Sequence, residues 1–96
     1  MNKFQVILTA HAIGDLHGPP KEYRDQIHKD LKTLPGNPFP QATTIKRLKG
    51  FRPPVYRLRS GDYRVLYSVR GIKLIILRVI DRRILEREIK RLKLSL

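Results

Sequence analysis

The order of secondary-structure signals predicts an α+β fold, with a small antiparallel β-sheet packed against N-terminal helices and a short C-terminal helix. Two observations lead to this prediction. Three segments rich in β-branched and aromatic residues follow one another between residues 55 and 80, separated by turn residues. Segments with a 3.6-residue apolar period lie before and after them. The length of 96 residues predicts a single domain over residues 1–96.

The N-terminal part of the chain predicts one strand and two helical segments. Phe4–Thr9 is apolar enough for a strand, and Ala10–Gly18 suits a short helical turn. Two prolines then precede a helix over Lys21–Leu34, where their fixed φ is compatible with the first helical turn. The apolar stripe of this helix, which we expect to cover one face of the sheet, consists of Tyr23, Ile27, Leu31 and Leu34.

The central part of the chain predicts the sheet. Thr43–Leu48 alternates enough for a short strand, and the main strands are expected at Val55–Arg59, Tyr63–Val69 and Ile72–Ile80. The last of these is almost continuously apolar, which indicates that both of its faces are covered.

A four-residue hairpin loop at Ser60–Tyr63 would place Arg59 opposite Arg64. The same register pairs Leu58 with Val65, Tyr56 with Tyr67, and Arg57 with Leu66. Because side chains alternate between faces, one face is then apolar and the other gathers Arg57, Arg59 and Arg64. A tight turn at Arg70-Gly71 predicts a second register, which pairs Tyr67 with Leu74 and Val65 with Ile76.

From Arg82 the pattern becomes that of an amphipathic helix. Its apolar stripe consists of Leu85, Ile89, Leu92 and Leu96. Packing within the molecule and docking to a partner are equally compatible with this stripe.

The net charge of +13 is concentrated in the second half of the chain. Residues 1–44 carry five Lys/Arg against four Asp/Glu, and residues 45–96 carry sixteen against four, so the two parts contribute +1 and +12. Such segregation predicts a polyanionic partner, nucleic acid before an anionic membrane, rather than charge for solubility alone. The absence of cysteine suits a reducing cytoplasm, and no apolar run approaches the roughly 20 residues that span a bilayer, so no membrane partner is expected.

The residues that carry chemistry are basic. His11, His17 and His28 lack ligand spacing, and no nucleophile or phosphate-binding glycine motif is present, so we expect neither a metal nor a cofactor. Guanidinium groups bind phosphate in a bidentate manner and keep their charge at physiological pH. A basic constellation therefore indicates a nucleic-acid-binding face more readily than a catalytic site; it consists of Lys46, Lys49, Arg57, Arg59, Arg64, Arg82 and Arg83.

Four short motifs resemble the RelE/ParE toxin superfamily of bacterial and archaeal type II toxin–antitoxin systems. They are Leu48-Lys49-Gly50, Tyr56-Arg57-Leu58-Arg59, Gly61-Asp62-Tyr63-Arg64-Val65-Leu66-Tyr67 and Val79-Ile80-Asp81-Arg82-Arg83. The resemblance implies a RelE-like fold, a cognate antitoxin as partner and, for the RelE branch, a ribosome-dependent endoribonuclease that binds rRNA and cuts mRNA by attack of a ribose 2′-OH on the adjacent phosphate. By motif position it implies that the catalytic residues are Arg57, Arg59, Arg64 and Arg82. Arg59 and Arg64 would hold the phosphate, and Arg82 the leaving oxygen. The RNA-binding residues expected beside them are Lys46, Lys49, Arg83 and Arg87.

Two departures from the pattern keep alternatives open. Many relatives carry a tyrosine shortly after the final arginine pair, where this chain has Ile84–Glu88. A general base is also not evident, although Asp81, Glu86 or Glu88 could serve. The alternatives are a ParE-like inhibitor of DNA gyrase without nuclease activity, and an RNA-binding module without catalysis.

Overall fold

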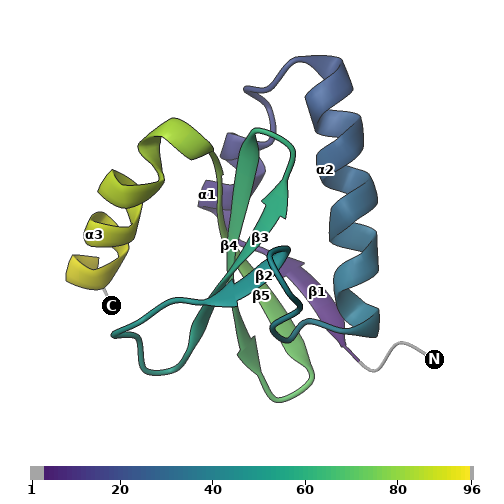
Figure 1. Ribbon diagram of the computed structural model, residues 1–96. Helices are drawn as coiled ribbons and strands as arrows, with labels where there is room; N and C mark the ends of the chain where they lie inside the picture. The colour runs from purple at the N-terminus through teal and green to yellow at the C-terminus, as the bar shows by residue number, and fades with distance from the viewer. Residues whose placement is uncertain (1–3, 96) are drawn as a thin grey trace.

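The computed structural model describes residues 4–95 and contains a five-stranded sheet between helices (Figure 1). The predicted elements are confirmed with small shifts of their ends. In chain order they are β1 (Gln5–Leu8), α1 (Ala10–Asp15), α2 (Lys21–Thr33), the 3₁₀ turn η1 (Leu34–Gly36), β2 (Ile45–Arg47), β3 (Val55–Ser60), β4 (Tyr63–Arg70), β5 (Lys73–Asp81), the 3₁₀ turn η2 (Arg82–Ile84) and α3 (Leu85–Ser95). Within residues 4–95 no helix has the length and apolar character needed to cross a membrane.

The strand order in the sheet is β1-β5-β4-β3-β2. Strands β2 to β5 pair with antiparallel neighbours, as expected, which confirms the α+β fold class. β1 pairs in parallel with β5, so the sheet is mixed rather than antiparallel throughout. Long connections containing helices allow such a parallel pairing, and here α1, α2 and the other strands lie between β1 and β5 in the chain.

The predicted register of the β3–β4 hairpin is confirmed in every pair, including Arg59 with Arg64 and Tyr56 with Tyr67. The predicted β4–β5 register is wrong. A two-residue loop, Gly71-Ile72, joins the strands, with Gly71 at a φ of +60° that suits glycine.

A β-bulge then shifts the β4–β5 register further. Tyr67 faces Ile76 and Leu66 faces Arg78, so Leu77 is left without a partner. The bulge places Val79 opposite Val65, and its extra residue lets Ile76 and Val79, three residues apart, lie in the same apolar core.

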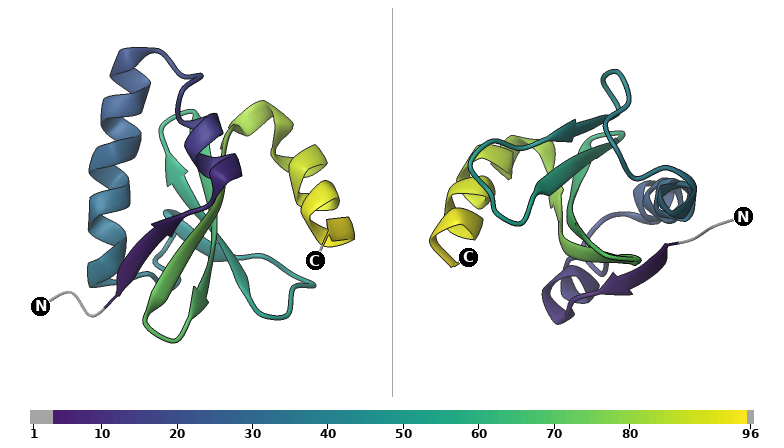
Figure 2. Two further views of the ribbon diagram at one scale, coloured as in Figure 1. Left: turned by 180° about the vertical axis from the view of Figure 1, so that it is seen from behind. Right: turned by 90° about the horizontal axis from the view of Figure 1, so that it is seen from below.

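Helices cover both faces of the sheet, as Figure 2 shows. On the α1–α2 face Ile27 and Leu34 are buried against Tyr67, whose hydroxyl donates a 2.7 Å hydrogen bond to the Pro38 carbonyl. The other face has a smaller core of Phe51, Val55, Leu66 and Ile80. Leu85, Ile89 and Leu92 of α3 pack against this core, so most of the predicted apolar stripe serves the fold itself; Leu96 lies outside the described residues.

Side chains of Thr9 and Asp15 make hydrogen bonds to the backbone of β5 beyond the end of β1. Thr9 Oγ1 donates to the Ile76 carbonyl at 2.8 Å, and Asp15 Oδ2 accepts from the Val79 N–H at 2.9 Å. Arg78 extends from the bulge and donates to Asp15 of α1 at 2.8 Å and to Glu88 of α3. Since the Glu88 side chain is only 3% exposed, this ion-pair network ties α1, β5 and α3 together in the interior.

Candidate nucleic-acid interface

The β3–β4 hairpin and η2 bring four predicted arginines together. Arg57, Arg59 and Arg64 project from the face that also carries Leu66 and α3, because Arg57 pairs with Leu66 and Arg59 with Arg64. The backbone N–H of Arg82 donates to the carbonyl of Asp62 at 2.8 Å, which joins the start of η2 to the hairpin turn. We call Arg57, Arg59, Arg64 and Arg82 the arginine cluster.

Burial and mutual repulsion both act on the guanidinium groups of this cluster. The pKa of Arg64 is lowered first by burial and then by the positive charges of Arg57, Arg59 and Arg82. Burial and the charge of Arg59 likewise lower the pKa of Arg57. Arginine nevertheless stays protonated in proteins, so the cluster holds concentrated positive charge that a bound anion would neutralise.

Much of the donor capacity of the cluster is not matched by acidic partners. Arg57 Nη2 donates to the Thr43 carbonyl at 2.7 Å, while its buried Nε has no partner among residues 4–95. Arg64 Nη1 donates to the carbonyls of Gly61 and Tyr63 at 2.8 and 2.9 Å. Arg82 is the cluster member with a nearby carboxylate, Asp62, at 3.6 Å. Arginines turned toward carbonyls rather than carboxylates keep their net charge available to a ligand.

The four predicted RNA-binding residues lie in different surroundings. Lys46 pairs with Arg57 across β2 and β3 and so extends the arginine cluster. Arg83 instead donates to Asp81 at 2.9 and 3.0 Å, and Arg87 on α3 donates to Glu88 at 3.2 Å.

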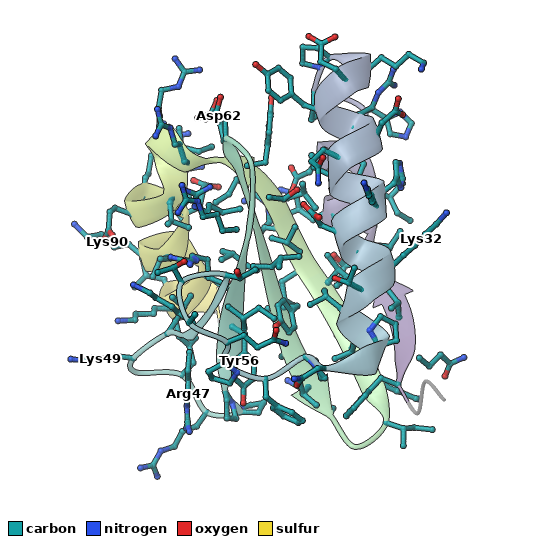
Figure 3. The ribbon with its side chains drawn as sticks, turned by 45° about the vertical axis from the view of Figure 1, so that its right-hand side comes forward. Lys32, Arg47, Lys49, Tyr56, Asp62 and Lys90 are labelled. Atoms are coloured by element: carbon teal, nitrogen blue, oxygen red, sulfur yellow. The ribbon has the colours of Figure 1, made fainter. Side chains whose placement is uncertain are left out.

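Lys49 lies apart from the cluster, in the β2–β3 loop. It lines a basic hollow of about 660 Å³ together with Arg47, Phe51, Arg52 and Lys93. Figure 3 shows Lys49 and Arg47 at the opposite end of the molecule from Asp62, whose carbonyl accepts the hydrogen bond from the Arg82 backbone N–H.

The carboxylates considered as general bases are held by arginines. Hydrogen bonds from Arg83 lower the pKa of Asp81 to about 2. Burial raises the pKa of Glu88, but hydrogen bonds from Arg78 and Arg87 outweigh it and leave the pKa below its ordinary value. Both groups are therefore weak proton acceptors at neutral pH. Glu86 is exposed on α3. Within residues 4–95 no group of three His, Asp or Glu side chains could hold a metal ion.

Two arrangements are not predicted by the sequence patterns. Arg78 lies within an apolar strand pattern, although a buried arginine in such a strand requires carboxylate partners. Tyr23 falls on the predicted core stripe of its helix, yet it is 38% exposed and its ring contacts that of Tyr63, with ring centroids 5.6 Å apart.

The fold and its basic hairpin agree with the resemblance to the RelE/ParE toxin superfamily, and comparisons with known proteins show the family. Residues 6–86 match the family described as "ParE toxin of type II toxin-antitoxin system, parDE". The chain belongs to this family and is a type II toxin–antitoxin toxin of the RelE/ParE kind.

Relatives named RelE support the same assignment. The chain is 39% identical over 83 residues to "Putative toxin RelE1" of Methanocaldococcus jannaschii, covering 84% of this chain and 91% of that protein. Among solved structures it resembles the archaeal RelE–RelB complex from Pyrococcus horikoshii OT3, with a TM-score of 0.72, 27% identity and coverage of 83% of this chain and 96% of that one. The RelBE2 toxin–antitoxin complex of Mycobacterium tuberculosis has a TM-score of 0.71, 26% identity and coverage of 83% and 99%.

Proposed function

We propose that this toxin is a ribosome-dependent mRNA endoribonuclease that inhibits translation. The observation that carries the proposal is the arginine cluster, in which three elements direct like charges toward one another. Directly opposed like charges such as Arg59 and Arg64 destabilise a sheet, so their retention is understandable where the face binds an anion. A phosphodiester in the transition state of cleavage is such an anion.

In the proposed reaction the ribose 2′-oxygen attacks the adjacent phosphorus and the bond from phosphorus to the 5′-oxygen breaks. The products are a 2′,3′-cyclic phosphate and a 5′-hydroxyl. Arg59 and Arg64 hold the non-bridging oxygens, and Arg82 stabilises the leaving 5′-oxygen, which takes up a proton from solvent. We take the 2′-OH proton to pass to solvent, since Asp81 and Glu88 are committed to arginines and Glu86 is exposed on α3.

The proposed partners are the ribosome with its mRNA and a cognate antitoxin, and the proposed location is the cytoplasm. The related structures from Pyrococcus and Mycobacterium are toxin–antitoxin complexes, which supports an antitoxin for this chain. A chain of net charge +13 favours an acidic antitoxin segment, because complementary charge speeds encounter and fixes orientation.

The decisive test is cleavage of mRNA on programmed ribosomes. We expect the wild type to cut in the A site and Arg64→Ala and Arg82→Ala each to lower the rate by about 10²- to 10³-fold, the usual cost of removing one transition-state donor. Arg70→Ala is the matched control, because Arg70 is exposed at the far end of the same strand as Arg64. Circular dichroism checks that each variant is folded. Equal rates in all four proteins would refute the catalytic assignment.

A second candidate function is inhibition of DNA gyrase without nuclease activity. The match to a family named for ParE favours it, as does the lack of any aromatic residue between Arg83 and Ser95. A gyrase supercoiling assay separates the two functions. Intact mRNA together with arrested supercoiling would establish the second candidate and overturn the first.

A further inference from the structure

A second hollow, of about 350 Å³, lies where the start of α2, the β3–β4 turn and the end of β5 meet. Arg82 is the one member of the arginine cluster in its lining, and the proposed chemistry gives no role to its aromatic residues. Its lining includes two aromatic, two acidic and two basic side chains: Tyr23, Tyr63, Asp62, Asp81, Arg82 and Arg83. A volume of this size is at the lower end of the range for small-molecule sites, roughly 300–1,000 Å³.

The two tyrosines provide an aromatic surface in this hollow. Their ring planes are tilted by 54°, and Tyr23 is 38% exposed. By contrast Tyr56 and Tyr67 are stacked within the core and are at most 8% exposed. Every nucleobase has a π face, so exposed aromatic rings are the usual platform for single-stranded nucleic acid.

The charges in the hollow cancel, which distinguishes it from the rest of this strongly basic chain. Asp81 pairs with Arg83 at 2.9 Å, and Asp62 approaches Arg82 at 3.6 Å. A locally neutral site with donors and acceptors fits the uncharged parts of a nucleotide, the base and the ribose, better than its phosphate. The Asp62 carboxylate, at a distance too long for a firm hydrogen bond to Arg82, can accept from a ribose hydroxyl.

Arg82 connects this hollow to the arginine cluster. It lines the hollow, and its backbone N–H is joined to the β3–β4 turn by the 2.8 Å hydrogen bond to the Asp62 carbonyl. An RNA strand with one phosphate against Arg64 and Arg82 would therefore have its next nucleotide at the mouth of the hollow.

We propose that the hollow between Tyr23, Tyr63 and Arg82 binds the base and ribose of the nucleotide next to the scissile phosphate. This inference rests on the proposed function, because it assigns a neighbouring nucleotide of the same substrate. The base stacks on the ring of Tyr23 and contacts that of Tyr63 at its edge, Asp62 accepts from the ribose, and Arg82 contacts the leaving oxygen of the phosphate. The hydroxyl of Tyr63 is available as a donor, since burial and the nearby Asp81 raise its pKa.

Titration by NMR with two small probes tests the site. Adenosine 5′-monophosphate carries base, ribose and phosphate, and ribose 5-phosphate lacks only the base. We expect the nucleotide to shift the ring signals of Tyr23 and Tyr63 and to leave those of the buried Tyr56 and Tyr67 unchanged. Ribose 5-phosphate should bind more weakly and leave all four rings unmoved. Identical affinities and shift patterns for the two probes would overturn the proposal.

Tyr23→Leu provides the matched variant, because Tyr23 is partly exposed and leucine preserves an apolar contact with Tyr63. We expect it to weaken binding of adenosine 5′-monophosphate about tenfold, within the range measured for loss of one stacked base, and to leave ribose 5-phosphate unaffected. An unchanged affinity for the nucleotide would refute the role of the ring.

The same titration distinguishes failure of this site from failure of the proposed function. Intact mRNA on ribosomes, together with tyrosine shifts on nucleotide binding, would refute the nuclease and support the site. Cleaved mRNA with unmoved tyrosines would support the nuclease and refute the site.

Discussion

Arg78→Met should destabilise the protein strongly, because it removes the cation that joins two carboxylates in the interior. Arg78 is 15% exposed, Asp15 14% and Glu88 3%. After the substitution Asp15 keeps its hydrogen bond from the Val79 N–H but has lost its ion-pair partner. Glu88 retains Arg87 and Arg91 at 3.2 and 3.4 Å.

The size of the loss in free energy of unfolding depends on how many ion pairs remain within residues 4–95: Asp15 keeps none and Glu88 keeps two. Breaking a buried ion pair costs about 3–5 kcal/mol, and the remaining partners of Glu88 place Arg78→Met near the lower end, about 3 kcal/mol. For a domain of this size each 1 kcal/mol corresponds to about 4–8 °C in melting temperature, so we expect a fall of about 12–24 °C.

Urea unfolding followed by circular dichroism measures this loss. Lys21→Met is the control, because it breaks the Lys21–Asp25 pair whose side chains are 81% and 65% exposed. Exposed pairs contribute about 0–1 kcal/mol, so the control should remain close to the wild type. If Arg78→Met lost no more free energy of unfolding than Lys21→Met, the buried network would not be holding the helices to the sheet.

Three further predictions concern pH, a buried hydroxyl and the arginine cluster. The folded-state pKa of Glu88 lies below its ordinary value of 4.5, so its stabilising contribution is present above that pH and is lost as the pH falls through the folded pKa. Denaturant titrations between pH 6 and about 2 should therefore show a shallower acid loss in Glu88→Gln than in the wild type; parallel profiles would contradict this. Tyr67→Phe should cost about 1–2 kcal/mol in urea unfolding, because the buried Pro38 carbonyl loses its hydrogen bond, and a neutral result would mean that the carbonyl finds another donor. Arg59→Thr should raise the free energy of unfolding by about 0.5 kcal/mol by relieving repulsion with Arg64, while it slows mRNA cleavage; reduced stability would show that the cluster is not strained by like charges.

The β3–β4 hairpin can be predicted residue by residue because two local rules agree. Alternation of apolar side chains and the expected loop over Ser60–Tyr63 allow one register that keeps arginines out of the core; the structure also pairs Ser60 with Tyr63, so the loop itself is Gly61-Asp62. These two rules are sufficient to place Arg57, Arg59 and Arg64 on one face. The β4–β5 register is not predictable in the same way, because the bulge at Leu77 interrupts the pairing inside an apolar segment. In such a segment the sequence has no polar alternation that would reveal a shift by one residue.

The remaining parts of the site depend on contacts between distant segments. Tyr23 and Tyr63 meet because α2 packs along the sheet, whereas the sequence pattern predicts only the apolar stripe of the helix. Arg82 and Arg83 are adjacent in the chain but have different partners, Asp62 and Asp81, once η2 turns the backbone. The pairing of Arg78 with Asp15 and Glu88 likewise requires the docking of both helices.

The most direct test of the central claim, that the arginine cluster promotes attack by a ribose 2′-OH, uses a message with a single 2′-deoxy substitution at the cleavage position. On programmed ribosomes we expect the wild-type toxin to cut the all-ribose message, to leave a 2′,3′-cyclic phosphate, and to leave the deoxy-substituted message intact. Arg64→Ala should cut the all-ribose message about 10²- to 10³-fold more slowly and leave the deoxy-substituted message intact. Cutting of both messages at the same rate by the wild type would contradict the mechanism, and failure to cut either would contradict the proposed function.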